Sequence, residues 1–528
     1  MTDSYDVVAI GAGHNGLVAA AYLARAGKKV LVLEKNPWVG GGVVTREITL
    51  PGFRHDTHST GHSMILPNPL ITQDELDLQS KFGLSYIIPD QPWSSVFEDG
   101  RILCFFRDRH KNAAEIAKFS QRDADAYLRF CDLTRSFLPV FLSSLYTPPV
   151  PVGALMAMLD QSDEGRMIYR ALHMSAWDIL NEWFENDCVK LHFMKVVSEN
   201  LSSPEEGGSA LGLFVFVGLM EEYGIATPRG GSGKLSDALV DCIKADGGEI
   251  ETGVEVTRVL ASNGRAVGVS TRDGREIKAR DAVIGAIHPH LLRRYIEGID
   301  PQVASDAEKT QTAMFSLFSI HCALDEPLKY RAGPEVANGY IIELLHSNML
   351  ETRRSFDSLR YGEIPEQLLL AIVSPSVFDP TRAPPGKGVM WGGSFLPFAL
   401  ADGGPEKWNE IGERVADRVI EAMQHYVSNL DSHNILARVA NTPLGALHDS
   451  DSFQNGDVHG LAPYLHQFGS HRPTPALGQY TVPGLEAFYL VGPAQHPGGG
   501  VFGAGRGTAM KMFDDLGMDF DAIARQKR

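Results

Sequence analysis

The chain has 528 residues and a formal net charge of −17 at pH 7. This acidic balance argues against a nucleic-acid partner and against broad electrostatic attachment to anionic membranes. Five cysteines are scattered along the sequence without metal-ligand spacing, and none belongs to a CxxC pair. We therefore expect no metal site, no redox-active disulfide, and free, mostly buried thiols in a reducing compartment.

The start of the chain carries the most specific motif. An apolar run leads into GAGHNG, whose glycines are Gly11, Gly13 and Gly16, and an alanine-rich segment and a second apolar run ending in Glu34 follow. This order is typical of a dinucleotide-binding βαβ unit, in which the glycines allow a tight turn and close approach of a pyrophosphate to the helix N-terminus. The acidic residue is placed to accept hydrogen bonds from ribose hydroxyls.

Two further glycine-rich segments favour FAD over NAD. The first is the run 40–42 beyond the second strand, although an ordinary glycine-rich turn is an alternative there. The second follows an apolar strand at 487–492 and leads into a helical pattern at 508–516. A second helix N-terminus would stabilise the negative charge that a reduced flavin ring acquires.

A dedicated nicotinamide or nucleoside triphosphate site is not expected. The segment 227–235 superficially resembles a phosphate loop, but Leu235 follows its lysine where serine or threonine is required. No second GxGxxG motif preceded by a strand is found. The substrate itself should therefore reduce the flavin.

Three segments resemble the phytoene-desaturase-like FAD oxidoreductases, namely GAGHNGLVAAAYLARAGKKVLVLEKNPWVGGGVVTRE, TPRGGSGKLSDAL and YLVGPAQHPGGGVFGAGRG. The resemblance covers nearly the whole chain and implies an α/β fold, a Rossmann-like FAD-binding domain of the amine oxidase and phytoene desaturase type with an inserted mixed-sheet and helical substrate domain. It implies that the ADP half of FAD is bound by Gly11, Gly13, Gly16, Glu34, Lys35, Gly41 and Gly42. It also implies that Val256 flanks the adenine and that Gly492, Val501 and Phe502 lie beside the flavin. Amine oxidases usually carry an arginine after the glycine pair, where this chain has Gly42 and Val43, with Arg46 the nearest candidate.

The cofactor motifs stand at both ends and in the middle, which predicts discontinuous domains. We assign the FAD-binding domain to residues 1–65, 225–300 and 475–528, and the substrate-binding domain with its helical cap to 66–224 and 301–474. Apolar spacing predicts helices within 112–141 and 164–197. It predicts strands at 314–323, 340–345, 368–373 and 389–395.

Histidines supply the candidates for the active site. His55, His58 and His62 could share a helix face and bind a metal, but Pro51 and the many small residues favour a loop. In the resembling family this stretch passes beside the flavin. We therefore name His58, His62 and His496 as candidate catalytic residues that line the active site.

These observations predict an FAD-dependent oxidoreductase that abstracts hydride from a C–H bond of an apolar, isoprenoid or carotenoid-like substrate, forming C=C or C=O. Oxygen or a quinone would accept the electrons. A flavin amine oxidase, a redox-neutral flavin isomerase and a non-catalytic flavin-binding interaction protein are alternatives.

The short acidic start indicates no leader peptide, so a cytoplasmic location is the default, with peripheral membrane contact as an option. Residues 137–159 are apolar but broken by prolines. We expect either a loop and helix packed over the substrate pocket or an interfacial patch through which a lipophilic substrate enters.

Overall fold

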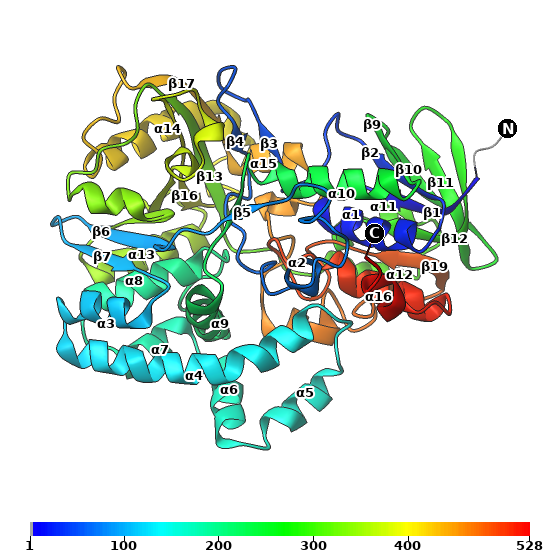
Figure 1. Ribbon diagram of the computed structural model, residues 1–528, viewed down its shortest axis with the longest axis horizontal. Helices are drawn as coiled ribbons and strands as arrows, with labels where there is room; N and C mark the ends of the chain where they lie inside the picture. Colours follow the sequence, from blue (N-terminus) through cyan, green and yellow to red (C-terminus); the bar gives the residue numbers. More distant parts are fainter. Residues whose placement is uncertain (1–3, 528) are drawn as a thin grey trace.

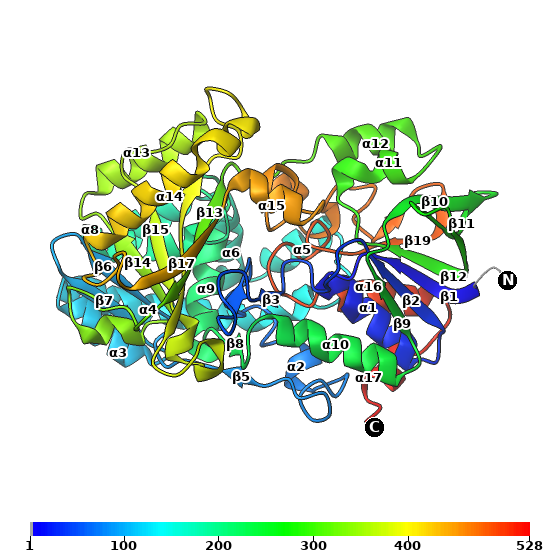
Figure 2. The same ribbon diagram turned by 90° about the horizontal axis from the view of Figure 1, so that it is seen from above.

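The computed structural model describes residues 4–527 and contains two large sheets, one in each half of the molecule (Figures 1 and 2). The first has eight strands in the order β10-β11-β19-β12-β1-β2-β9, with β18 paired to β19. Its strands are β1 (Ser4–Ile10), β2 (Val30–Glu34), β9 (Glu249–Thr252), β10 (Val256–Ser262), β11 (Arg265–Thr271), β12 (Glu276–Gly285), β18 (Thr481–Val482) and β19 (Leu485–Leu490).

The predicted βαβ unit forms the centre of this sheet. β1 pairs in parallel with both β2 and β12, and α1 (His14–Arg25) connects β1 to β2. The helix is alanine-rich and buried along almost its entire length, because α10 (Gly233–Ala245) and α16 (Gly505–Asp515) pack beside it (Figure 2). A Cβ atom on Gly16 would come within 2.9 Å of the Gly11 carbonyl oxygen, so this close packing requires glycine.

The second sheet has seven strands in the order β17-β13-β16-β15-β14-β6-β7. Its strands are β6 (Trp93–Phe97), β7 (Ile102–Phe105), β13 (Ser316–Leu324), β14 (Ile341–Leu345), β15 (Leu370–Val373), β16 (Gly388–Leu396) and β17 (Ile435–Asn441). The strands predicted at 314–323, 340–345, 368–373 and 389–395 are thereby confirmed. The remaining strands are β3 (Thr45–Arg46) paired with β4 (His55–Asp56), and β5 (Tyr86–Ile87) paired with β8 (Thr227–Pro228).

Helices cover both faces of the second sheet. On one face, a hydrophobic core forms between the sheet and α14 (Trp408–Gln424). On the other face, a larger core forms between the sheet and the helical lobe at the lower left of Figure 1. The lobe consists of α3 (Arg109–Ala117), α4 (Gln121–Leu145), α5 (Val152–Leu159), α6 (Asp163–His173), α7 (Ala176–Trp183), α8 (Asp187–Ser198) and α9 (Ser209–Glu222). The other helices are α2 (Pro69–Thr72), α11 (Leu292–Tyr295), α12 (Pro301–Glu308), α13 (Met349–Arg360), α14 (Trp408–Gln424), α15 (Pro443–Asp449) and α17 (Phe520–Ala524).

The strands of the first sheet all come from the three segments assigned to the FAD domain. One boundary needs correction. Residues between Leu70 and Leu84 were assigned to the substrate domain, but their apolar side chains are buried in the same core as α1 and α10. Residues 1–3 and 528 lie outside the described part of the chain. They belong to the terminal segments assigned to the FAD domain, and residues 1–3 also belong to the start for which no leader peptide is expected.

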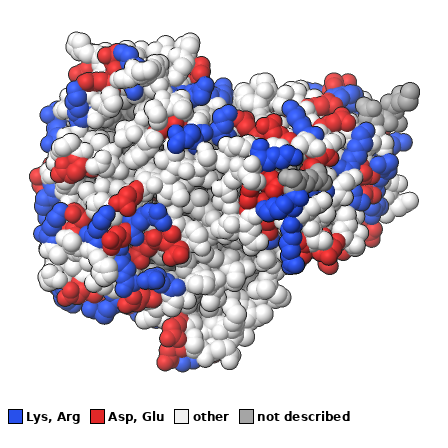
Figure 3. All heavy atoms as spheres, viewed as in Figure 1, with Lys and Arg blue, Asp and Glu red and all other residues white. Residues whose placement is uncertain are grey.

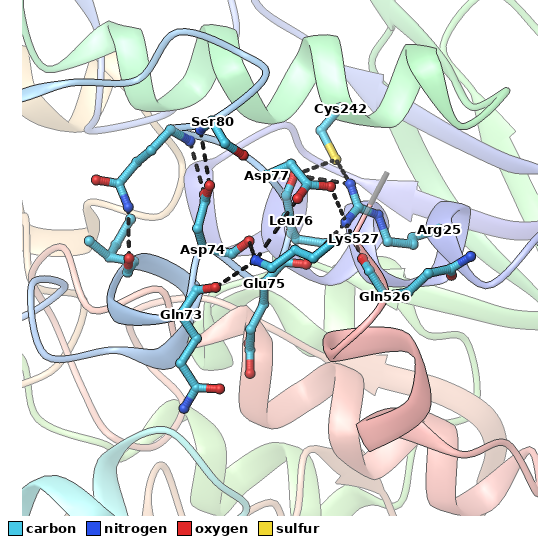
Figure 4. A network of polar contacts seen from close by, with 12 residues as sticks. Arg25, Gln73, Asp74, Glu75, Leu76, Asp77, Ser80, Cys242, Gln526 and Lys527 are labelled. Atoms are coloured by element: carbon cyan, nitrogen blue, oxygen red, sulfur yellow. Dashed lines mark hydrogen bonds and ion pairs between the residues drawn. The ribbon is translucent and has the colours of Figure 1, made fainter.

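A buried polar network attaches the C-terminal end of the chain to this domain (Figure 4). Arg25, at the end of α1, pairs with Asp77 at 2.9 Å and with Asp246 at 3.3 Å, and all three side chains are at most 3% exposed. Its guanidinium also donates to the backbone carbonyl of Gln526. Lys527 donates to two carbonyls of the 73–74 turn. The network fixes the ends of distant segments against one another.

Within residues 4–527, no helix is both long and apolar enough to span a bilayer. The same residues contain no cluster of three or more His, Cys, Asp or Glu side chains arranged to hold a metal ion. All five cysteines are reduced and buried.

Candidate active site

A single large cavity runs from the centre of the first sheet to the second sheet, with about 2040 Å³ of empty space including its open mouth. Its lining extends from the glycine motif beside the first sheet to strands of the second sheet, so one cavity adjoins both sheets. It is lined by every residue assigned above to the cofactor: Gly11, Gly13, Gly16, Glu34, Lys35, Gly41, Gly42, Val256, Gly492, Val501 and Phe502.

The βαβ end of the cavity presents donors and one buried carboxylate. Gly13 precedes α1 without a side-chain cap, so the first N–H groups of the helix are available to an anion. Glu34 accepts hydrogen bonds from the backbone N–H of Ala12 at 2.8 Å and of Asn36 at 2.9 Å. Burial raises the pKa of Glu34, and these two donors oppose the shift. The carboxylate is thus held in a fixed orientation at the end of β2.

The glycine-rich loop before α16 forms the opposite wall. Gly499, Gly500, Val501 and Phe502 line the cavity, and α16 begins immediately afterwards. The loop is fixed from outside the cavity, because the Asn68 side chain donates to the Phe502 carbonyl at 2.8 Å. The two helix starts that the sequence indicated therefore lie on the same cavity.

The residues present fit a dinucleotide. A Cβ atom on Gly13 or on Gly492 would meet no heavy atom of the protein within 4 Å, so both backbones adjoin open space. His14 and Asn15, at the start of α1, have buried side-chain atoms without a hydrogen-bond partner in the described chain. Burial lowers the pKa of His14 to about 4. Buried unpaired polar groups are rare in proteins, and a bound phosphate or ribose would satisfy those that face this cavity.

The three candidate histidines have different surroundings in the structure. His58 lines the cavity, and its Nε2 atom lies 3.1 Å from Asp449 Oδ2. His62 is not among the cavity-lining residues of the described chain, because it is fully buried with Nε2 2.7 Å from the Ser232 hydroxyl. Burial lowers its pKa to about 3.

His496 also lies outside the cavity lining of the described residues. Its Nε2 atom is 2.9 Å from the Ser144 carbonyl oxygen, so it connects the glycine-rich loop before α16 to the end of α4. The structure therefore corrects the prediction for His62 and His496, whose contacts are those of buried structural residues.

Sequence reasoning missed part of the cavity lining near the βαβ unit. The segment after α15 contributes Ser450, Asp451, Ser452 and Phe453 to the lining, and Asp451 pairs with Lys35 at 2.9 Å. No motif marks this segment. His14 and Asn15 could have been found, because they occupy the variable positions of the glycine motif.

The substrate side of the cavity is mainly apolar. It is lined by residues from α9 and from four strands of the second sheet, together with loop residues: Met64, Phe216, Ile225, Leu317, Ile341, Val373, Trp391 and Val458. Polar residues also line this part of the cavity, among them Ser63, Glu199, Asn200 and His459.

A model of the family described as "Flavin containing amine oxidoreductase" matches residues 16–504. The chain belongs to this family. FAD is its cofactor, and the protein is an FAD-dependent oxidoreductase. The predicted α/β fold of the amine oxidase and phytoene desaturase type is confirmed.

Its relatives also confirm the resemblance to phytoene desaturases. The chain is 30% identical to mouse (Mus musculus) pyridine nucleotide-disulfide oxidoreductase domain-containing protein 2, over 97% of this chain and 94% of the relative. It is 27% identical to one of the subunits of limonene dehydrogenase from Castellaniella defragrans, over 97% and 95%. It is 25% identical to a lycopene-forming phytoene desaturase of Pseudescherichia vulneris, over 96% and 99%.

A crystal structure of an oxidoreductase from Methanosarcina mazei has the same fold, with a TM-score of 0.61 and 17% identity over 97% of this chain and 99% of that chain.

Proposed function

We propose that this protein dehydrogenates an apolar substrate, removing hydride from a C–H bond to leave a C=C or C=O bond. The observation that carries the proposal is that the cavity lined by the cofactor motifs continues into a chamber with mainly apolar walls. Two relatives are named as a component of a limonene dehydrogenase and a phytoene desaturase, which favours dehydrogenation over other flavin chemistry.

The backbone of the two helix starts would hold the cofactor. The N–H groups around Gly13 would bind the pyrophosphate, and Glu34 would accept from the ribose, while Val256 would pack against the adenine. The loop at Val501 and Phe502 would lie beside the flavin. Bound FAD supplies the hydride acceptor.

The protein's own contribution would be position and exclusion of water. An apolar chamber holds a C–H bond by shape and keeps solvent away from the reacting carbon. His58 is the candidate catalytic residue that remains at the cavity, and its contact with Asp449 fixes the orientation of the imidazole ring.

The test is an anaerobic titration of the FAD-loaded protein, followed by the visible flavin band. We expect NADPH to leave the band oxidised and a lipophilic C–H donor to bleach it, after which oxygen or a quinone restores it. Rapid bleaching by NADPH would contradict the proposal, and failure to bind FAD would contradict the site as well.

An amine oxidase is the second candidate, favoured by the family description. It predicts that amines bleach the band and that air then yields hydrogen peroxide. An isomerase would convert its substrate without an acceptor, and a non-catalytic flavin protein would resist every donor.

We also propose that a lipophilic substrate enters from a membrane surface at α5. This helix carries no charged residue, and Val150, Met158, Met167 and Tyr169 on and around it are between 39% and 52% exposed. In Figure 3 the atoms at the bottom of the molecule, where α5 lies in Figure 1, are mainly uncharged, whereas the left part of the helical lobe carries many charged side chains. Cosedimentation with uncharged phosphatidylcholine vesicles should be lost in Met158→Asp, and unchanged cosedimentation would contradict the entry route.

A further inference from the structure

A buried cluster of charged residues forms part of the cavity wall on the substrate side. The ammonium of Lys195, on α8, lies 2.5 Å from Glu199 and 2.8 Å from Glu343. The side chains of Lys195 and Glu343 are 1% and 0% exposed, whereas that of Glu199 is 21% exposed, and Glu199 lines the cavity. Glu199 is therefore the member of the cluster that lines the cavity.

The second sheet places this cluster beside the apolar chamber. Glu343 stands two residues after Ile341 on β14, so the two side chains lie on the same face of the sheet. Ile341 pairs with Val373, which in turn pairs with Trp391 on the next strand, and all three line the cavity. A charged group is thus fixed at the edge of a mainly apolar surface.

The position of Glu199 on its helix does not favour a carboxylate, although the residue pairs with the buried Lys195 ammonium. Glu199 caps the C-terminus of α8, where the helix dipole disfavours an anion. Lys195 precedes it by four residues, which is the less favourable order for an ion pair on a helix.

The whole cluster also costs stability. It buries one ammonium beside two carboxyl groups, and burial raises the pKa of Glu343, which favours the protonated form of that group. Oε1 of Glu343 has no hydrogen-bond partner among the described residues. Buried charges with this balance are seldom retained for stability alone.

We propose that Glu199 is the polar anchor of the substrate site, and that it accepts a hydrogen bond from a single donor group, a hydroxyl or an ammonium, on an otherwise apolar substrate. Lys195 and Glu343 act as positioning residues that hold the carboxylate at the wall. The inference rests on the proposed function and narrows its substrate class, because it excludes pure hydrocarbons.

The physical basis is the cost of covering a carboxylate. A donor group replaces the water that leaves Glu199 when substrate binds, whereas a hydrocarbon leaves the charge without a partner. A hydrogen bond to a charged group contributes enough to change a dissociation constant by about 10–100-fold.

The test uses two probes that differ in donor capacity alone. 1-Decanol and 1-methoxynonane have the same number of heavy atoms, and only the alcohol donates a hydrogen bond. Each is titrated into the FAD-loaded protein, and binding is read from the perturbed flavin absorbance and by calorimetry. We expect the alcohol to bind about 10–100-fold more tightly than the ether.

Glu199→Leu should abolish the preference, and Lys195 keeps Glu343 as its partner in this variant. Glu199→Gln, which preserves volume, should reduce the preference and serves if the leucine variant does not fold. Glu185→Leu is the matched control, because this glutamate side chain is 49% exposed and lies outside the cavity lining of the described chain. The control should keep the full preference.

Decylamine distinguishes the two donors. Binding tighter than that of decanol, lost in Glu199→Leu, would support an ammonium as the donor; weaker binding would support a hydroxyl. Equal binding of alcohol and ether, failure of both to bind, or a preference that survives in both Glu199 variants would each overturn the inference. Failure of the proposed function has a different signature, since no lipophilic C–H donor would then bleach the flavin by dehydrogenation, whatever the ratio of probe affinities.

Discussion

Gly13→Ala separates the role of this residue in binding the cofactor from any role in folding. The backbone at Gly13 has φ −64° and ψ 152°, which any residue adopts, and a Cβ atom there meets no heavy atom within 4 Å. We therefore expect the apoprotein to keep its free energy of unfolding within about 1 kcal/mol. The methyl group, however, occupies the space into which a pyrophosphate must come to reach the N-terminus of α1.

The expected loss follows from the hydrogen bonds that the methyl group prevents. Two backbone bonds to a phosphate are worth about 1.5–3 kcal/mol each, so the dissociation constant for FAD should rise by about 10²–10⁴-fold. The assay is a fluorescence titration of the apoprotein with FAD, together with thermal unfolding without FAD. Gly153→Ala is the matched control, because its Cβ also meets open space but on α5. Unchanged FAD affinity in Gly13→Ala would refute the placement of the pyrophosphate.

Three further predictions concern the buried charges. Arg25→Ala should lower the free energy of unfolding by about 3–5 kcal/mol in urea titrations, because it removes a buried guanidinium that pairs with two buried carboxylates (Figure 4). Arg525→Ala, at a side chain 78% exposed, should have little effect, and equal effects of the two substitutions would contradict this prediction. Glu34→Gln should weaken FAD binding by about 10–100-fold, since a ribose hydroxyl then donates to a neutral acceptor, and an unchanged titration would show that the ribose lies elsewhere. Burial raises the pKa of Glu343 from 4.5 to about 8, so the folded protein retains a proton that the unfolded chain releases. The free energy of unfolding should therefore decline as pH rises from about 4.5 to about 8, by at most about 1.4 kcal/mol per pH unit. Glu343→Gln should remove that slope in urea titrations, and a slope that persists would show that Glu343 is not its source.

The cofactor half of the site was predictable because its chemistry resides in the backbone. A glycine that must allow a close approach leaves a visible trace in the sequence, as at Gly11 and Gly13, and the acid at the end of the second strand has a fixed spacing. Strands such as β13 and β16 were also predictable, because they are buried on both faces and consist mainly of apolar and small residues.

The histidines show that the sequence alone does not predict which side chains of a loop face the cavity. His58 and His62 stand four residues apart in the same segment, yet one faces the cavity and the other bonds to Ser232 in the core. The direction of a side chain in a loop depends on partners that are distant in sequence. A motif places the segment beside the cofactor, but only the tertiary contacts decide which ring reaches it.

The substrate half of the cavity could not be predicted from the sequence, for a different reason. Its walls are ordinary apolar residues from strands and helices that also serve as core, so nothing distinguishes Val373 as a cavity residue from a buried valine elsewhere. A polar side chain in such a wall, at a position where packing does not require one, can distinguish one substrate from another. In the described structure Glu199 has this character, since it is supported by Lys195 from within the wall and stands at a helix end that disfavours its charge. If Glu199 is the polar anchor that we propose, the specificity of this enzyme should depend less on the shape of its apolar chamber than on the substrate group that hydrogen-bonds to Glu199.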